Sequence, residues 1–206
     1  SMTMDLSNQN KLGEFHEELK RINIKVIRPD INKCFADFQF DEDNFYYALG
    51  GIKSVGFEAI SNVVKERKKN GNFKSINDFL NRVSPKDINK LQLEGLVKAG
   101  AFDNIDINRQ ALFNSIPNFI LKTKNIFENK AANQIDLFGS DEEQDNEIVL
   151  NIDDWNFEDR LSREFEAIGF FISDHPLNQF KEIFDDYKIV DYVKFNLDDD
   201  IKDANI

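Results

Sequence analysis

Cysteine and histidine are nearly absent from this chain of 206 residues, which has one cysteine and two histidines. The single Cys34 excludes an intrachain disulfide and a thiolate cluster for zinc. His16 and His175 alone exclude a histidine-rich metal site. No apolar run approaches the ~20 residues of a membrane helix, and no charged-then-apolar leader is present. We therefore expect a cytoplasmic protein without a membrane partner.

Positive charge is also scarce, but it is concentrated in one region. The net charge is −12, yet residues 51–100 hold ten Lys or Arg against five Asp or Glu. Residues 134–206 hold six against twenty-one. Screening over ~8–10 Å decouples distant charges, so the basic segment can face nucleic acid. A solvated surface with an acidic end accounts for the same charges equally well.

No catalytic constellation is visible. The paired carboxylates Asp153-Asp154 and Asp185-Asp186 are adjacent in sequence, and adjacent helical residues do not share a face. They read as caps or solvated charge. His175, directly before Pro176, reads as a packing or turn-capping residue. We expect no catalytic residue, bound cofactor or metal ion in this chain.

Hydrophobic periodicity predicts a mainly α fold with a small α/β entry. The entry combines a helix at residues 11–23 with strands at 24–27, 35–40 and 46–49 and a turn at 41–44. Four helices should follow, beginning near Phe57, after the cap Ser75, at Ser84-Pro85 and near Asp106. Pro117 should kink or interrupt the last one.

The C-terminal part alternates between polar and helical patterns. Residues 129–153 are acidic and without helical period, which predicts an exposed loop. A helix should resume after Trp155 with Phe157, Leu161, Phe165 and Ile168 on one stripe. A turn at 173–176 and a short helix with Phe180, Ile183 and Phe184 should follow.

A glycine-bounded corner, residues 51–56, lies directly before the first helix of the block. Glycines at this spacing allow a tight turn with positive φ, and the first turn of a helix offers free amides to an anion. We expect the amides of Ser54, Val55, Gly56 and Phe57 to face a phosphate oxygen. Lys53 would add charge without reading sequence, while Ile52 and Val55 plug the corner into the core. A plain strand-to-helix turn is the simpler alternative.

Two further features support phosphate binding. Lys65, Lys68 and Lys69 crowd the end of the helix that starts near Phe57, where they also complement its dipole. A second glycine corner begins at Gly100, with Asn108 and Arg109 opening the next helix. Two such hairpins could stack about a pseudo-twofold axis.

The acidic loop contains one apolar peptide, Gln134-Ile135-Asp136-Leu137-Phe138. An apolar pair on an exposed loop is a liability unless a partner covers it. Leu137 and Phe138 can fill two neighbouring pockets, while the Gln134 amide sets the register. The alternative is that the pair tethers the loop to the helical block.

These segments together resemble the C-terminal half of bacterial DNA polymerase III alpha subunits, the C family of polymerases. From about Lys11 to Tyr187, five segments match in order: "INIKVIRPDIN" the end of the fingers, "YALGGIKSVGFEAISNVVKERKKNGNFKSINDFLNRV" the first helix-hairpin-helix, "LEGLVKAGAFDNI" the second hairpin, "QIDLFG" the clamp-binding motif, and "LSREFEAIGFFISDHPL" the approach to the OB domain.

The resemblance implies a division of the chain and a role for each part. Residues 1–50 would end the fingers, 51–128 form a tandem helix-hairpin-helix domain, 129–153 carry the clamp peptide, and 154–206 lead to a truncated OB-type domain. The partners implied are duplex DNA at Gly51, Lys53, Ser54, Val55 and Gly56, and the sliding clamp, the beta subunit of the holoenzyme, at residues 134–138.

The resemblance also implies what this chain does not do. The family's catalytic aspartates, which use magnesium, lie upstream in a palm domain, and other holoenzyme subunits bind through domains outside this chain. Some hairpins of this type hold a monovalent cation through loop carbonyls. The alternative function is an accessory module of a clamp-associated DNA repair enzyme. A protein-interaction scaffold without DNA contact is a third possibility.

Overall fold

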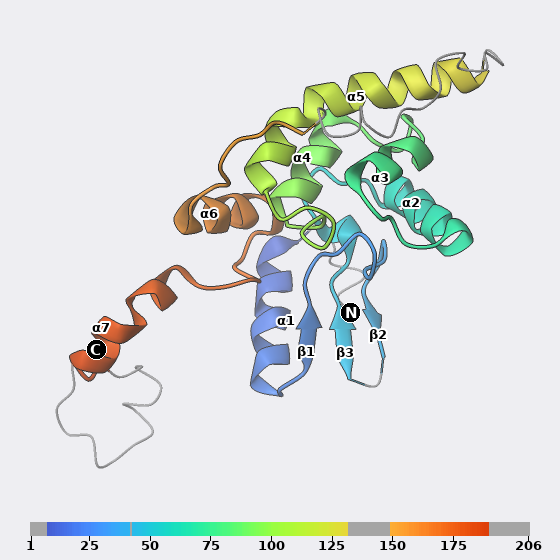
Figure 1. Ribbon diagram of the computed structural model, residues 1–206. Coiled ribbons are helices and arrows are strands. Elements are labelled where there is room, and N and C mark those ends of the chain that lie inside the picture. The colour runs from blue at the N-terminus through green and yellow to red at the C-terminus, as the bar shows by residue number, and fades with distance from the viewer. Residues whose placement is uncertain (1–7, 42, 132–148, 190–206) are drawn as a thin grey trace. The chain divides into compact units, whose positions relative to one another are not determined.

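The computed structural model describes residues 8–41, 43–131 and 149–189. The chain divides into two compact units, Ser1–Ile172 and Ser173–Ile206, which we describe separately. Helices predominate beside one small sheet (Figure 1). The prediction of a mainly α fold with a small α/β part is confirmed.

The α/β part of the first unit is a helix beside a three-stranded sheet. Helix α1 (Gln9–Arg21) lies alongside β1 (Lys25–Ile27) in Figure 1. β1 pairs in parallel with β3 (Asn44–Tyr46), and β3 pairs antiparallel with β2 (Gln39–Phe40). The predicted strands at 35–40 and 46–49 are therefore wrong in their bounds, because a 3-10 turn, η2 (Leu49–Gly51), already begins at Leu49.

The Asp41 side chain shapes the turn between β2 and β3. Its carboxylate accepts hydrogen bonds from the Tyr46 hydroxyl at 2.7 Å and from the amides of Asp43 and Asn44 at 3.1 and 2.8 Å. These bonds, that from Tyr46 foremost, stabilise the charged form and lower the pKa of Asp41 to about 2. The local bonds favour this turn over a longer strand.

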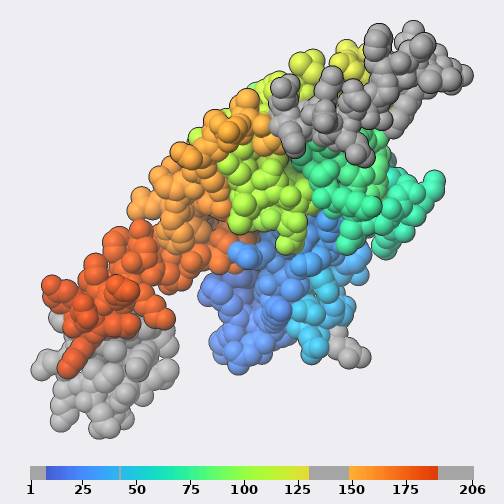
Figure 2. Space-filling model, viewed as in Figure 1, coloured from blue at the N-terminus to red at the C-terminus, as the bar shows by residue number. Residues whose placement is uncertain are grey.

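Four helices form the larger part of the first unit: α2 (Phe57–Asn70), α3 (Ile76–Arg82), α4 (Lys90–Lys98) and α5 (Arg109–Ala131). Their buried side chains, among them Phe79, Leu93 and Phe119, form one core with Leu12 of α1 and Tyr47 after β3. The surface of these helices directly adjoins that of the α/β part (Figure 2). One shared core therefore fixes the helices against the sheet.

The start of α4 departs from the prediction. Ser75 caps α3 as expected, with its hydroxyl accepting from the Asp78 amide at 3.1 Å. Ser84-Pro85, however, opens only a local turn, and α4 begins five residues later. The cap is Asn89, which exchanges hydrogen bonds with Gln92 in a capping box. Ile88, 3% exposed, enters the core first, and this delays the helix.

Helix α5 is longer than predicted at its far end. Asn108 caps it, accepting from the Ala111 amide at 2.9 Å. The helix continues past Pro117 without interruption and includes residues 129–131, which were predicted as loop. Pro117 is exposed, whereas Ile116 and Phe119 on the same helix are buried. Their burial offsets the lost backbone hydrogen bond.

Helix α6 (Phe157–Ile168) completes the first unit and resumes after Trp155 as predicted. Leu161 and Ile168 are buried, but Phe157 and Phe165 are 39% and 47% exposed, so the predicted stripe is only half buried. The Phe165 ring lies 5.1 Å from that of Phe171. Two of the four apolar positions therefore remain on the surface of this unit.

The second unit is described for residues 173–189 only. It contains a 3-10 helix, η4 (Pro176–Phe180), and a short helix, α7 (Lys181–Asp186). The His175 ring accepts from the Leu177 amide at 3.2 Å, which confirms its turn-capping role. Within the described ranges, no helix is both long and apolar enough to cross a membrane.

Candidate functional site

The glycine corner joins η2 to α2, and two of its side chains anchor it in the core. Ile52 and Val55 are 2% and 7% exposed, whereas Lys53, Ser54 and Gly56 are exposed. Ile52 donates to the Leu49 carbonyl at 3.3 Å and Val55 to the Ile52 carbonyl at 3.1 Å. The predicted anchoring by Ile52 and Val55 is confirmed, and the corner presents its polar face outward.

The glycines of the corner act differently from the prediction. The positive φ belongs to Ser54, at 66°, while Gly56 has φ −75°. The role of nearby glycines is instead to let other backbone segments approach closely. A Cβ on Gly50 would lie 2.6 Å from the Ala36 carbonyl oxygen, and one on Gly95 of α4 would lie 2.8 Å from that of Lys53. Gly50 of η2 thus lets residues 35–36 pack closely beside the corner, and Gly95 lets α4 pack against it.

Three of the four expected amides are available. Those of Ser54, Gly56 and Phe57 have no acceptor among the described residues. The Val55 amide is used by Ile52, and the Gly51 amide donates to Ala48 at 3.0 Å. The corner therefore offers fewer donors than predicted, and these lie at and just before the exposed first turn of α2.

The charge around the corner is mixed. In the described residues, no carboxylate pairs with the Lys53 ammonium, whereas Lys98 is held by Glu166 at 2.9 Å. The backbone of Lys53 is fixed by its amide, which donates to the Ala167 carbonyl of α6 at 2.8 Å. The side chain of Lys53 thus remains able to meet an anion while its backbone is held.

The lysines at the end of α2 do not join the corner. Lys65 lies eight residues beyond Phe57, or ~12 Å along a helix. Lys65 and Lys69 border a separate hollow of about 280 Å³ that also includes Arg82, whereas the Lys68 ammonium lies 5.4 Å from the Phe35 ring centroid. These cations can reach phosphates other than the one at the corner.

The second glycine corner is occupied by the protein itself. Gly100 has a positive φ of 75°, and its missing Cβ leaves room for the Arg109 guanidinium. Arg109 is 4% exposed and bonds Asp103 at 2.6 and 2.8 Å. Although burial opposes it, these bonds raise the pKa of Arg109. The Gln110 amide donates to the Asp154 carboxylate at 3.0 Å, so a carboxylate of this chain already fills the anion position.

The clamp-binding peptide, Gln134, Ile135, Asp136, Leu137 and Phe138, lies outside the described residues. In residues 8–41, 43–131 and 149–189, no three His, Cys, Asp or Glu side chains gather as metal ligands would. The prediction did not include two neighbours of the corner, Gln9 and Ala167. Their positions follow from the tertiary fold, and no local signal marks them.

Comparisons with known proteins agree with the geometry of the corner. A helix-hairpin-helix motif model matches residues 23–112. The DNA polymerase III subunit alpha of Caulobacter vibrioides is 38% identical over 177 residues, covering 86% of this chain and 16% of the relative. Those of Borreliella burgdorferi and Campylobacter jejuni are 36% and 37% identical, covering 91% and 94% of this chain and 17% and 16% of the relatives. The chain thus spans about a sixth of the length of these proteins.

Proposed function

Because this chain belongs to the family of DNA polymerase III alpha subunits, we propose that it holds duplex DNA by its backbone during DNA-templated synthesis, without an active site of its own. The observation that carries this proposal is the outward face of the glycine corner. There, within the described part of the chain, the amides of Ser54, Gly56 and Phe57 have no acceptor and the Lys53 ammonium has no carboxylate partner. Such a face suits one phosphate group.

Binding of this kind is indifferent to base sequence. Backbone amides and one lysine reach phosphate oxygens, which are the same at every nucleotide. Lys65, Lys68 and Lys69 would add contacts to other phosphates, and each would strengthen the salt dependence. The buried Arg109 and the Asp154 carboxylate make the second corner an internal brace. We therefore assign DNA contact to the first corner and to the end of α2.

The clamp peptide gives the second half of the proposal. Residues 134–138 would dock in a hydrophobic pocket of the sliding clamp, with Leu137 and Phe138 as anchors. Tethering raises the effective concentration of a polymerase at its template. Polymerase chemistry, its magnesium ions and the other holoenzyme subunits would belong to the remainder of the longer protein, and we assign magnesium to no residue of this chain.

An accessory module of a DNA repair enzyme is the alternative function. It would present the same hairpin and the same clamp peptide. The relatives argue against it, because polymerase III alpha subunits match 86–94% of this chain, well beyond the helix-hairpin-helix segment. The α/β part and α6 are thus also accounted for by the polymerase family.

The DNA-binding proposal is tested with the whole chain and two unrelated duplexes of equal length. Fluorescence anisotropy across a salt series should show that Lys53→Ala weakens binding to both duplexes equally. The slope of log K against log salt should fall by about one, because one phosphate contact is lost.

The matched control is Lys124→Ala on α5, an exposed lysine that borders neither the corner nor the end of α2. It should leave the slope unchanged. No measurable binding at low salt, or a Lys53→Ala effect confined to one duplex, would contradict the proposal.

A further inference from the structure

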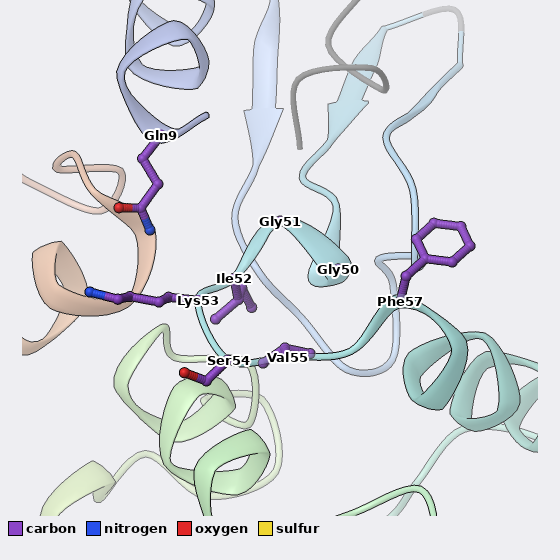
Figure 3. Close-up of a pocket in the computed structure, with 8 residues that line it drawn as sticks. All are labelled: Gln9, Gly50, Gly51, Ile52, Lys53, Ser54, Val55 and Phe57. Carbon is purple, nitrogen blue, oxygen red and sulfur yellow. The ribbon is translucent and has the colours of Figure 1, made fainter. Parts of the chain in front are cut away.

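A hollow of about 490 Å³ lies beside the glycine corner and extends past it. It is lined by the corner itself and by one residue from outside the helix-hairpin-helix segment, Gln9 at the start of α1. Figure 3 shows the Gln9 side chain reaching toward the side of the corner on which Lys53 lies, with Phe57 at the opposite end. A ligand in the hollow can therefore contact Gln9 as well as the corner.

The charge of the lining distinguishes this hollow from its neighbours. Among the described residues that line it, Lys53 is a cation and none carries a carboxylate. The hollow on the other face of Lys53 and Ser54 includes Glu94 and Glu166, and the one at the end of α2 includes Glu66 and Asp87. The hollow at the end of α2 also holds three cations, Lys65, Lys69 and Arg82. What sets the hollow beside Gln9 apart is that its described lining offers an anion a cation without a competing carboxylate.

The lining also presents donors without acceptors. The carboxamide of Gln9 is half-buried and has no hydrogen-bond partner among the described residues, and neither has the Ser54 hydroxyl. A partly desolvated amide without a partner is costly unless a ligand or water completes it. Together with the amides of Ser54 and Phe57, which also line the hollow, these groups suit the oxygens of a phosphodiester.

The position of Gln9 is set by the end of α6. Gly169, with φ 92°, follows that helix, and a Cβ there would lie 2.6 Å from the Gln9 Cβ. Two residues earlier, the Ala167 carbonyl accepts from the Lys53 amide. The residues at and just after the end of α6 thus contact both Gln9 and the corner.

We propose that this hollow is an extended phosphodiester subsite, in which the Gln9 carboxamide donates to a backbone oxygen of the same DNA strand that meets the corner. The inference rests on the proposed function and adds a neutral contact to it. Gln is a common donor to phosphate oxygens. Since it carries no charge, its contact releases no counterion and leaves the salt slope alone.

The test uses the whole chain, the two duplexes and the salt series described above. Gln9→Ala should weaken binding about three- to tenfold at every salt concentration, the range of one neutral hydrogen bond, with an unchanged slope. Gln9→Glu should weaken binding further, because it puts a carboxylate in the hollow. An acidic residue in the first turn of a helix does not destabilise the helix, so thermal unfolding should confirm that Gln9→Glu is folded.

Asn10→Ala is the matched control, since Asn10 is the exposed neighbour on α1 and does not line the hollow. It should bind DNA as the unaltered chain does. If both Gln9 variants bind normally while Lys53→Ala is impaired, the subsite is wrong and the proposed function stands. If neither Gln9 nor Lys53 matters, both proposals fail. A changed salt slope in Gln9→Ala would also contradict a neutral contact.

Discussion

At the scale of single residues, the positive φ at the corner belongs to Ser54 rather than to a glycine. A non-glycine residue at φ 66° costs roughly 1 kcal/mol relative to an ordinary conformation. The cost is met by neighbours, since Ile52 and Val55 on either side are buried. In this conformation the exposed Ser54 has an amide with no acceptor in the described chain.

Asp41 offers a pH test at the same scale. Because its pKa is lowered, the ionised carboxylate stabilises the β2–β3 turn fully above its ordinary value of 3.8 and loses this effect as pH falls through about 2. Tyr46→Phe removes the largest cause and should raise the pKa of Asp41 toward 3.8. NMR titration of the Asp41 carboxyl carbon measures it.

Tyr47→Phe is the control for this titration, since the buried Tyr47 hydroxyl has no hydrogen-bond partner in the described residues. It should leave the Asp41 pKa near 2. An Asp41 titration curve that is identical in Tyr46→Phe and in the unaltered chain would show that the hydroxyl does not hold the charge.

At the scale of elements, two residues can be compared as the N-cap of α4, Asn89 and Ser84. Asn89→Ala removes the side-chain half of the capping box and should lower the free energy of unfolding by about 1 kcal/mol. Ser84→Ala removes a hydroxyl that serves only a local turn and should cost less than about 0.5 kcal/mol. Denaturant unfolding compares the two, and an equal or larger loss in Ser84→Ala would contradict the assigned helix start.

The elements also show where sequence reasoning succeeds. Helix periodicity and the Ser75 cap are local signals, and they predicted α1, α2, α3 and α6 closely. The start of α4 depended on whether Ile88 is buried, which is a tertiary fact. At the corner, the anchoring by Ile52 and Val55 was predictable. The internal hydrogen bond of the Val55 amide and the contacts of Gln9 could not be predicted, because they depend on how the chain packs in three dimensions.

At the scale of the whole molecule, α6 contacts both glycine corners, which lie far before it in the sequence. Glu164 of α6 is 1% exposed and lies 3.6 Å from the Arg109 guanidinium of α5, while Ala167 holds the corner. Residues of α6 therefore support the part of the structure that ends with α5. The proposed clamp peptide, residues 134–138, lies between these two parts in the sequence.

The clamp peptide is tested by the double substitution Leu137→Ala and Phe138→Ala. It should abolish binding to a cognate sliding clamp. We expect the unaltered chain to bind near micromolar affinity, or about −8 kcal/mol, because a segment of the polar composition of residues 129–153 pays an ordering cost on docking. Titration calorimetry measures the affinity, and circular dichroism should show an unchanged fold. Leu121→Ala, at an exposed leucine of α5, is the control. Undiminished clamp binding by the double variant would refute the motif.

The most direct measurement is an amide NMR titration of the labelled chain with duplex DNA at low salt. We predict that the amide signals of Ser54, Gly56 and Phe57 shift together, while those of Gly100, Ala101 and Gln110, which are bonded within the protein, stay in place. Shifts at the second corner with none at the first would contradict the account, because the DNA would then be held somewhere other than the amides that lack acceptors.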